Sequence, residues 1–344
     1  MSKITIGIGA VAIAAAAISS PALAKDKLTS VTALQTNNAM SQSFLTTFVA
    51  PLNKKAGDAL NISYIGGQEV VPPRKAANAL KRGQFDMLHS PSSYYIGTVP
   101  EAYALLASNH GPKAVRKNGG WEVLQDIWAK KAGAYLLAWG ESMTSYHMYL
   151  AKKPPMKDGL PDLTGFKMRA TGTYRPLFRA LGATTINIKS SEVINAVQRG
   201  TVDGFGFTDQ PASVGFQEVI KYRVVPNFYQ TNTVITVNLD AWKAMSAAQK
   251  KMLTEVGIEY ETASVLWSED FRKGDEQKLK AAGAEDIVLS KDAAARYLEI
   301  AHGEIWKELA KRSDHAEKLR PLLYVPGKPQ FQVDAASLGA RHRN

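Results

Sequence analysis

Apolar residues recur along this chain with two alternating periods. Short runs in which every second residue is apolar are followed by stretches in which apolar residues return every three or four positions, and glycines or polar turns separate them. In the first half of the chain the pattern predicts strands at 27–34, 60–65, 85–89 and 134–139, and helices at 41–56, 74–81 and 121–131. Strands that alternate with helices are typical of an α/β fold.

The block from 160 to 207 shows this alternation most clearly. Leu163, Phe166 and Met168 alternate with polar residues as in a short strand, and helical spacing follows from 174 to 181. The pattern then predicts a strand at 185–188, a helix at 192–199, a strand at 201–207 and a helix at 211–219. The block is therefore expected to form a βαβαβ unit.

Arg169 stands directly after the first strand of this block, where the chain passes into a helix. In open α/β sheets, ligands bind beyond the carboxyl ends of the strands. A guanidinium keeps its charge at physiological pH and offers a planar set of donors that matches a carboxylate. Arg169 is therefore a candidate anchor for an acidic ligand, with Thr171 and Tyr174 beside it, although a surface arginine in a solvated ion pair would also fit the composition.

Several motifs in this block resemble those of the solute-binding proteins of TRAP transporters. The run L-x-D-L-x-G-x-K-M-R ends at Arg169, and the family's further motifs follow in order at Gly182-Ala183, Ser191-Glu192-Val193, 196–200 and Val202-Asp203-Gly204. The resemblance covers nearly all of the chain after residue 24. It implies that Arg169 forms a salt bridge with the carboxylate of a small organic acid and that a membrane permease is the partner.

The same resemblance implies an α/β, two-lobed periplasmic-binding-protein fold with crossing strands. Its long helix, which spans both lobes in the family, would correspond to the helical pattern from 246 to about 282. The expected division is a signal peptide at 1–24, the N-terminal part of lobe one at 25–147 and lobe two at 148–232. A return strand, the long helix and C-terminal helices follow at 233–325, and a tail at 326–344.

Other candidate ligand-binding residues stand at strand ends or in loops that match the family. They are Gln35, Asn38, Gln68, Ser90, Ser92, Tyr94, Trp139, Glu141, Phe207 and Asp209. Turn and capping roles would explain the polar residues of the first lobe equally well, and a surface position would explain Glu141. Many family members carry a second arginine where this chain has Ser142-Met143-Thr144. Its absence favours a ligand with a single carboxylate and with hydroxyl or aromatic character.

The N-terminus has the pattern of a secretory signal. Lys3 precedes an apolar run of about 15 residues, shorter than the roughly 20 that a spanning helix needs, and Ala22-Leu23-Ala24 is a small-x-small cleavage site. The chain has no cysteine, which excludes disulfides, thiolate metal sites and a lipid-anchored cysteine. We therefore expect a mature protein that begins at Lys25 and is free in the periplasm.

Composition narrows the classes of function further. The formal net charge is +11 and becomes +10 without Lys3, since 41 basic and 31 acidic residues remain. Scattered basic residues and an export signal argue against nucleic acid as partner. The six histidines are dispersed, and neither H-E-x-x-H nor G-x-S-x-G occurs, so no catalytic group, cofactor or metal is expected. The alternative class is a periplasmic lyase or hydrolase that acts on a small carboxylate.

Overall fold

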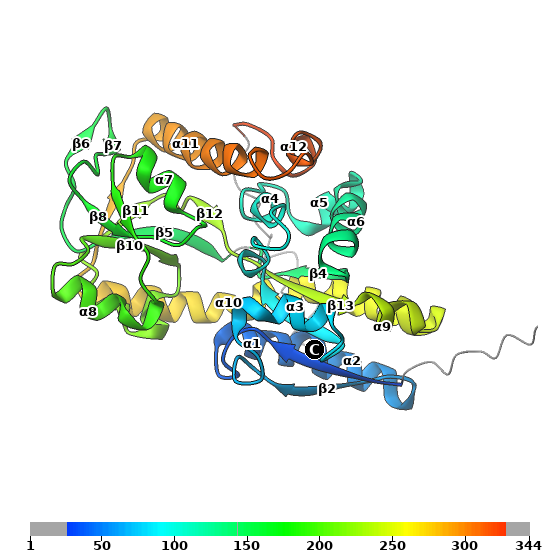
Figure 1. The fold of residues 1–344 in the computed structure, drawn as a ribbon. Coiled ribbons are helices and arrows are strands. Elements are labelled where there is room, and N and C mark those ends of the chain that lie inside the picture. The colour runs from blue at the N-terminus through cyan, green and yellow to red at the C-terminus, as the bar shows by residue number, and fades with distance from the viewer. Residues whose placement is uncertain (1–25, 143, 328–344) are drawn as a thin grey trace, which may run out of the picture.

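The computed structural model describes residues 26–142 and 144–327, which form two main β-sheets with helices packed on their faces (Figure 1). The first sheet has five strands in the order β2-β1-β3-β13-β4. Their bounds are β1 (Lys27–Thr32), β2 (Asn61–Gly66), β3 (Met87–Pro91), β4 (Ala134–Gly140) and β13 (Thr233–Asn238). β1, β2 and β3 are parallel, and β13 runs antiparallel to both β3 and β4.

The second sheet follows the order β14-β11-β5-β10-β8-β9, and β12 pairs with β5. Its strands are β5 (Ser145–Leu150), β8 (Lys167–Arg169), β9 (Thr184–Ile186), β10 (Gly204–Thr208), β11 (Tyr222–Val225), β12 (Tyr229–Gln230) and β14 (Glu285–Val288). β8, β9 and β10 are parallel, whereas β5 is antiparallel to β10 and β11. β6 (Met156–Lys157) and β7 (Leu160–Pro161) form a separate two-stranded sheet. We call the first sheet and its helices lobe one, and the second sheet and its helices lobe two.

Helices cover both faces of these sheets. Lobe one contains α1 (Ala39–Phe44), α2 (Ala50–Ala56), α3 (Ala76–Lys81), α4 (Ala102–Leu106), α5 (Pro112–Lys117), α6 (Gly120–Ala132) and α9 (Leu239–Ala244). Lobe two contains α7 (Arg175–Ala180) and α8 (Val193–Gln198), and the chain continues through α10 (Ala247–Ala281), α11 (Lys291–Ala310) and α12 (Ala316–Leu323). Short 3₁₀ turns lie at Gly57–Ala59, Pro73–Lys75, Ser92–Tyr94, Ser190–Glu192, Pro211–Val214 and Phe216–Glu218. Among the described residues, no helix is both long and apolar enough to cross a bilayer.

Two segments connect the sheets at the same place. β4 passes through residues 141–144 into β5, and β12 passes through residues 231–232 into β13. The Thr231 N–H donates to the Thr144 carbonyl at 2.6 Å, so the two crossing segments are bonded to each other. β1, β3 and β4 end at this side of the first sheet, and β8, β9 and β10 end at this side of the second. The carboxyl ends of strands from both lobes therefore face each other across the crossings.

Helix α10 runs along both lobes (Figure 1). In lobe one, Glu261 of α10 pairs with Arg116, with 2.7 Å between Oε1 and Nη2. In lobe two, the Asp275 carboxylate accepts from the backbone N–H groups of Ala212 and Ser213 at 2.7 and 3.0 Å. Because one continuous helix is bonded to both lobes, it limits how they can move relative to each other.

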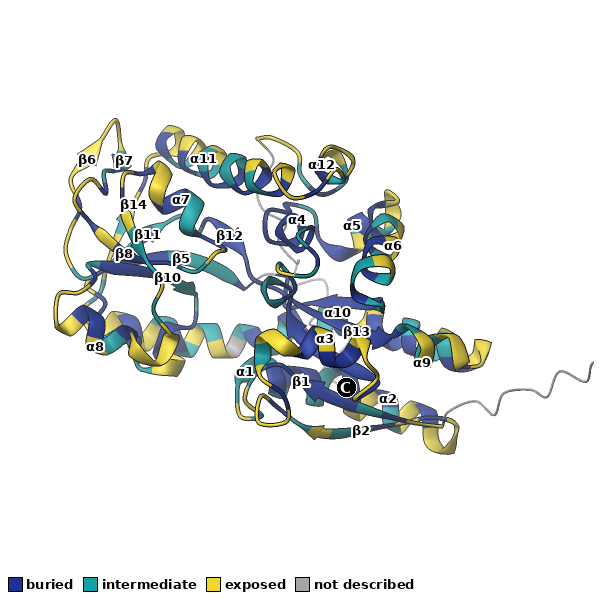
Figure 2. Cartoon of the chain, in the orientation of Figure 1, coloured by how far each residue is buried: buried dark blue, intermediate teal, exposed yellow. Residues whose placement is uncertain are grey.

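The strands form the most buried part of the molecule (Figure 2). All six residues of β13 are buried, and so are all five of β3. Helices, in contrast, bury one face and expose the other, as α10 and α11 do in Figure 2. β3 and β13 also bury polar residues such as His89 and Thr236, so their burial on both faces exceeds what the alternation of apolar residues in the sequence indicates.

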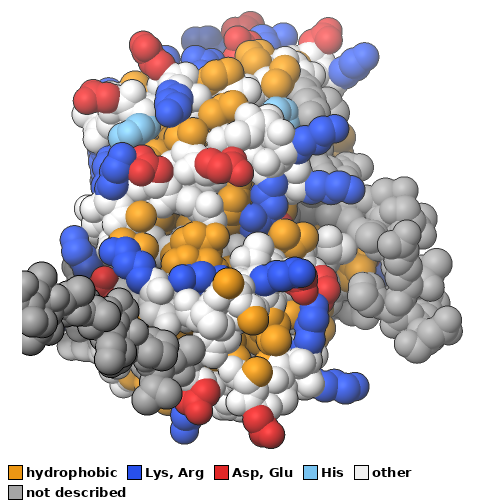
Figure 3. All heavy atoms as spheres, turned by 90° about the vertical axis from the view of Figure 1, so that its right-hand side faces the viewer, with side chains coloured by type: hydrophobic (Ala, Val, Ile, Leu, Met, Phe, Trp, Pro, Cys, Tyr) orange, Lys and Arg blue, Asp and Glu red, His pale blue; other side chains and the backbone are white. Residues whose placement is uncertain are grey.

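The surface carries charges of both signs. Figure 3 shows Lys and Arg side chains spread across the face that lies on the right of Figure 1, with Asp and Glu among them. On α6, for example, Lys130 Nζ lies 2.7 Å from Asp126 Oδ2. Local ion pairs of this kind offset part of the excess positive charge.

The predicted α/β fold with two lobes is confirmed, and the long helix predicted from 246 to about 282 is α10. Two predicted helices are wrong in detail. The one at 41–56 is interrupted by a π-helical segment at Leu45–Val49, because Pro51 has no N–H to donate to the carbonyl four residues earlier. The one at 211–219 is two 3₁₀ turns separated by Gly215, whose φ is +81°. The predicted signal peptide at 1–24 and most of the tail at 326–344 lie outside the described residues.

Gly140 ends β4 where α10 approaches most closely. A methyl group at this position would lie 2.3 Å from Cε1 of Tyr260, and that ring is fully buried and bonded through its hydroxyl to Thr233 at 3.0 Å. We expect Gly140→Ala to lower the free energy of unfolding by about 1–3 kcal/mol, since a packed core must shift to admit the methyl group. Urea denaturation followed by circular dichroism measures this change.

Gly274, in the interior of α10, provides the control. A methyl group there meets no heavy atom within 4 Å. Gly274→Ala should therefore raise the free energy of unfolding by about 0.5–1 kcal/mol through helix propensity. Equal effects of the two substitutions would contradict the packing described for Gly140.

Candidate functional site

Arg169 is the last residue of β8, and only 5% of its surface is exposed. It pairs with Phe205 of β10 and Ile186 of β9 in parallel register. The preceding side chain, Met168, is fully buried in the core, and alternation along the strand turns Arg169 to the other face. The guanidinium thus leaves the sheet at a carboxyl end that faces lobe one, as the sequence predicted.

Neutral acceptors hold the Arg169 side chain. Its Nε donates to the Ile188 carbonyl at 3.0 Å, and its Nη1 donates to the Tyr174 hydroxyl and to the Gly206 carbonyl, the latter at 3.3 Å. Among the described residues, Nη2 has no hydrogen-bond partner and no carboxylate pairs with this guanidinium. A largely buried charge without a counter-ion is unfavourable unless an anion joins it. The arrangement is therefore suited to receive a carboxylate.

Three tyrosines lie around the Arg169 charge. Tyr174 precedes α7, Tyr146 lies in β5, and Tyr94 comes from the turn after β3 in lobe one. Burial raises the pKa of Tyr146 to about 12 and also raises the pKa of Tyr94 and of Tyr174, while the nearby Arg169 charge acts in the opposite direction. The rings of Tyr146 and Tyr174 are 5.7 Å apart. All three remain neutral hydroxyls at physiological pH and can donate a hydrogen bond to a carboxylate.

A second arginine approaches this group from lobe one. The Arg74 guanidinium lies 5.6 Å from the centre of the Tyr94 ring, and its charge acts on the Tyr94 hydroxyl together with that of Arg169. Arg74 is exposed, and none of the ion pairs of the described residues includes it. The region around Tyr94 therefore carries positive charge from both lobes.

Glu141 and Asp209, which we call the crossing acids, lie where the chain passes between the lobes. Glu141 follows β4 with φ +57°, a backbone conformation that is uncommon outside glycine. Only 1% of Glu141 is exposed, and its Oε2 accepts from Ser268 Oγ of α10 at 2.7 Å. Asp209 follows β10; its Oδ2 accepts from the Ser145 N–H at 3.2 Å and lies 4.0 Å from Nη1 of Arg272. One acid belongs to each lobe, and α10 contacts both.

The crossing acids hold protons more tightly than ordinary carboxyl groups. Burial raises the pKa of Glu141 to about 7, and the charge of Asp209 adds to this effect. Burial likewise raises the pKa of Asp209 to about 7, against the nearby charge of Arg272. Hydrogen bonds from Ser43 and Ser268 act against the rise in the pKa of Glu141. Asp209 Oδ1 is buried without a hydrogen-bond partner among the described residues, so Asp209 has one oxygen ready for a further donor.

The other candidates of lobe one fall into two groups. Gln35 and Gln68 are exposed, and Asn38 caps α1 by accepting from the Met40 N–H at 3.0 Å, a role the sequence left open. Ser90 and Ser92 are buried at the end of β3; the Ser90 hydroxyl donates to the Pro91 carbonyl at 3.1 Å, whereas Ser92 Oγ has no partner among the described residues.

The remaining candidates lie near the crossings and beside Arg169. Trp139 is fully buried at the end of β4, and its Nε1 lacks a partner in the described part of the chain. Phe207 packs edge-on against Phe216, with ring centres 4.8 Å apart, on the helix side of lobe two. Thr171 accepts from the Thr173 N–H at 3.4 Å in the turn that follows Arg169. The structure thus gathers Arg169, Tyr94, Thr171 and Tyr174 in one group and Glu141 and Asp209 in another, and it packs Trp139 in the hydrophobic core.

The structure adds Tyr146, Arg74 and Arg272 to the residues predicted from sequence. Tyr146 stands one residue after the start of β5, and this position beside a crossing was the only signal in the sequence. Arg74 and Arg272 lie on helices whose partners depend on how the two lobes face each other. No local pattern distinguishes them from other surface arginines.

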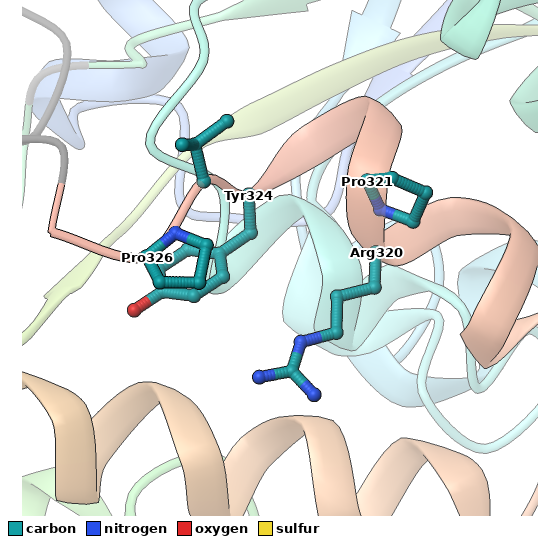
Figure 4. A pocket seen from close by; sticks show the side chains of 5 residues that line it. Arg320, Pro321, Tyr324 and Pro326 are labelled. Atoms are coloured by element: carbon teal, nitrogen blue, oxygen red, sulfur yellow. The ribbon is translucent and has the colours of Figure 1, made fainter.

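Within residues 26–142 and 144–327, no group of three or more His, Asp or Glu side chains could hold a metal ion. A surface pocket of about 330 Å³ lies near the C-terminal helices and is lined by Arg320, Pro321, Tyr324, Val325 and Pro326. Figure 4 shows Tyr324 and Pro326 on one side of it and Arg320 with Pro321 on the other. None of the candidate residues lines this pocket.

Two sheets joined by paired crossing segments, with strand ends facing each other across them, define a two-lobed binding protein. Residues 31–313 match the family described as bacterial extracellular solute-binding protein, family 7, or DctP. The match covers most of the chain, so the protein belongs to this family. It is therefore a solute-binding protein that takes part in transport, and not an enzyme. The periplasmic lyase or hydrolase that was the alternative class is excluded.

Known relatives of low sequence identity are also binding proteins. The chain is 22% identical over 201 residues to the monocarboxylate 2-oxoacid-binding periplasmic protein of Nostoc sp., in a match that covers 56% of this chain and 54% of the relative. The chain thus spans about half the length of this curated relative.

Solved structures match over most of their length. A TRAP periplasmic solute-binding protein from Desulfovibrio salexigens with bound orotic acid has TM-score 0.72 and 17% identity, covering 86% of this chain and 96% of that one. Another from Haemophilus influenzae with bound L-gulonate has TM-score 0.68 and 17% identity, covering 86% and 97%. At such identity these likenesses show the fold.

We expect Glu141→Gln to change how stability depends on pH. The folded protein binds the Glu141 proton up to about pH 7, whereas the unfolded chain releases it near the ordinary pKa of 4.5. Stability that wild type owes to this proton is therefore lost as pH rises between these values. The free energy of unfolding of wild type relative to Glu141→Gln should fall by on the order of 2–3 kcal/mol over this window and then stay level.

Urea denaturation at intervals from pH 4.5 to 8 measures the difference between the two proteins. Glu276 provides the control, because its hydrogen bond with Arg223 lowers its pKa to about 2. The stability that ionised Glu276 contributes is fully present above the ordinary pKa of a glutamate. The difference in free energy of unfolding between wild type and Glu276→Gln should therefore be constant over the same pH window. A constant difference for Glu141→Gln as well would contradict the burial described for Glu141.

Proposed function

We propose that this protein is the periplasmic solute-binding protein of a TRAP-type transporter, and that it captures a small organic acid through an ion pair between Arg169 and the ligand carboxylate. The observation that carries the proposal is the Arg169 guanidinium, largely buried at a strand end and held, within residues 26–142 and 144–327, by neutral acceptors alone. An arginine that served the fold alone would be expected to pair with an acid of the chain. Nη2, which has no partner in the described part of the chain, and the hydroxyls of Tyr94 and Tyr146 are the donors offered to the carboxylate.

Closure of the lobes strengthens this capture. Tyr94 belongs to lobe one and Arg169 to lobe two, so a ligand between them contacts both. When the lobes approach and water leaves, the ion pair acts in a medium of lower dielectric constant and becomes stronger. The closed protein then offers one combined surface to a membrane permease, to which it delivers the acid. Membership of an extracellular solute-binding family supports this part of the proposal.

Arg169→Ala should weaken binding of the acid by roughly 30-fold to 3000-fold. Loss of one partner from a buried charge pair costs about 2–5 kcal/mol, and about 1.4 kcal/mol corresponds to a factor of ten in Kd. Arg169→Lys should also bind poorly, since an ammonium keeps the charge and loses the planar pair of donors. Isothermal titration calorimetry with a panel of organic acids measures both effects.

Arg179 supplies a matched control. It lies on α7 close to Arg169 in sequence, is exposed, and donates only to Thr185 Oγ1 at 3.3 Å. Arg179→Ala should therefore bind the acid normally. Normal affinity in folded Arg169→Ala would refute the proposed site, whatever the behaviour of Arg179→Ala.

We expect the exported protein to lack residues 1–24. The Ala22-Leu23-Ala24 site is typical of signal peptidase cleavage, which would release a mature chain that begins at Lys25. Mass spectrometry of protein from a periplasmic extract measures the N-terminus directly. An intact N-terminal segment on the exported protein would overturn this expectation.

A further inference from the structure

Tyr103 of α4 forms a hydrogen bond from one lobe to the other. Only 2% of this side chain is exposed, and its hydroxyl donates to the Gly172 carbonyl at 3.2 Å. α4 belongs to lobe one, whereas Gly172 lies in the turn of lobe two between β8 and α7. A methyl group at Gly172 would lie 3.7 Å from the Tyr103 hydroxyl, which is an ordinary contact distance. A side chain of lobe one thus holds the backbone of lobe two.

The turn that Tyr103 holds also carries the neighbours of the anchor. Residues 171–173 begin two positions after Arg169 and end directly before Tyr174. Burial raises the pKa of Tyr174, and the Arg169 charge and hydrogen bonds from the side chain and backbone of Thr171 act against this rise. The same Tyr174 hydroxyl accepts from Nη1 of Arg169. The turn is therefore bonded, through Tyr174, to the guanidinium.

The position of Tyr103 is itself fixed by the contacts around α4. The Arg312 guanidinium lies 5.7 Å from the centre of the Tyr103 ring, and Nη2 of Arg312 donates to Glu308 of α11 at 2.7 Å. Two residues further along α4, the Leu105 carbonyl accepts from the Asn232 side chain of a crossing segment at 3.2 Å. Because Tyr103 already has little freedom, it can restrain the turn at a small further cost in entropy.

A role in stability alone is the alternative for this hydroxyl. Helix α11 packs against α4 in lobe one and against α7 in lobe two, so the relative position of the lobes does not depend on one hydrogen bond. A bond from Tyr103 to any other part of lobe two would serve stability equally well. Its partner is the turn that leads from Arg169 to Tyr174, where a restraint acts on the anchor.

We propose that Tyr103 is a positioning residue of the carboxylate site, whose hydroxyl, from lobe one, holds the turn of lobe two that orients the Arg169 guanidinium. This inference rests on the proposed function, in which Arg169 binds the ligand carboxylate. A guanidinium that is oriented in advance loses less entropy when it binds. The anchor is best ordered while the lobes hold the arrangement described here, so a carboxylate on Arg169 and this arrangement favour each other.

Hydrogen exchange at Arg169 tests this positioning without a ligand. Nε donates to the Ile188 carbonyl at 3.0 Å, so its proton exchanges with water only when the guanidinium leaves this orientation. Tyr103→Phe keeps the ring and removes the bond to Gly172. We expect the Nε proton of Arg169 to exchange about 2-fold to 10-fold faster than in wild type, the change that one hydrogen bond produces. Nitrogen-15 NMR measures the rate, and the loss of the signal in Arg169→Lys assigns it.

Tyr95→Phe is the matched control. Tyr95 is fully buried in lobe one, and its hydroxyl is bonded to Thr236 Oγ1 at 2.7 Å, so the same substitution again removes one hydrogen bond. Urea denaturation measures the loss of stability in each variant. Tyr95→Phe should leave exchange at Arg169 unchanged, whatever its stability. Unchanged exchange in Tyr103→Phe, or an equal rise in both variants, would overturn the inference.

Thr171→Val tests the route from the turn to the anchor. This substitution removes the hydroxyl that bonds to Tyr174 and keeps the shape of the side chain. If the effect of Tyr103 passes through Thr171, the double variant should exchange no faster than the faster of the two single variants. Multiplication of the two single effects would overturn the inference.

Calorimetry with pyruvate, L-lactate and benzoate as probes relates the exchange rates to binding. For the probe that wild type binds most tightly, Kd should rise about 2-fold to 10-fold in Tyr103→Phe and stay the same in Tyr95→Phe. Faster exchange with an unchanged Kd would overturn the positioning role, and the exchange rates alone decide it where no probe binds. Normal binding of that probe by folded Arg169→Ala would instead refute the proposed function, independently of the exchange rates in Tyr103→Phe.

Discussion

The charge of Arg169, which no carboxylate of the described residues pairs with, is the constraint on which the proposed binding site depends. A guanidinium cannot give up its proton to lower the cost of burial, so the protein must surround it with acceptors or supply an anion. Here the backbone of β10 and of the segment after β9 provides carbonyl acceptors, and Tyr174 provides a hydroxyl. These groups fix the orientation of the Arg169 guanidinium, but none of them is an anion that could balance its charge. The side chain is thus oriented before a ligand arrives, which reduces the entropy lost on binding.

The guanidinium of Arg169 points to the place where the strand ends of the two sheets meet at the crossings. Positive charge lies toward Arg169 and Arg74, and the crossing acids Glu141 and Asp209 lie toward the connection between the lobes. In the proposed complex the ligand carboxylate lies toward Arg169, because Arg272 already stands beside Asp209 at the other end. The neutral tyrosines between them add hydrogen-bond donors without adding charge.

Local features of the sequence were sufficient to place Arg169 and Tyr174. A short strand followed by a turn and a helix identifies the carboxyl end of a strand, and a family motif ends at the same residue. Tyr146 could not be predicted, because its proximity to Arg169 depends on the pairing of β5 and β8 with β10 inside lobe two. The position of Arg74 beside Tyr94 depends on how the chain folds within lobe one. The burial of Glu141 also depends on tertiary structure, since serines of α10, more than a hundred positions along the chain, cover it. Pro51 is the opposite case, because a proline inside a predicted helix is a local signal for an irregular turn.

The continuity of α10 has a mechanical consequence. Its contacts with lobe one extend to Ser268, which bonds to Glu141, and its contacts with lobe two begin at Arg272, which lies beside Asp209. Only one turn of helix separates these two attachments, so a change of angle between the lobes must be taken up as curvature within a few residues of a single rod. Helices curve gently and resist sharp bends unless proline or a similar defect interrupts them. A continuous helix attached to both lobes within one turn therefore opposes changes in the angle between them.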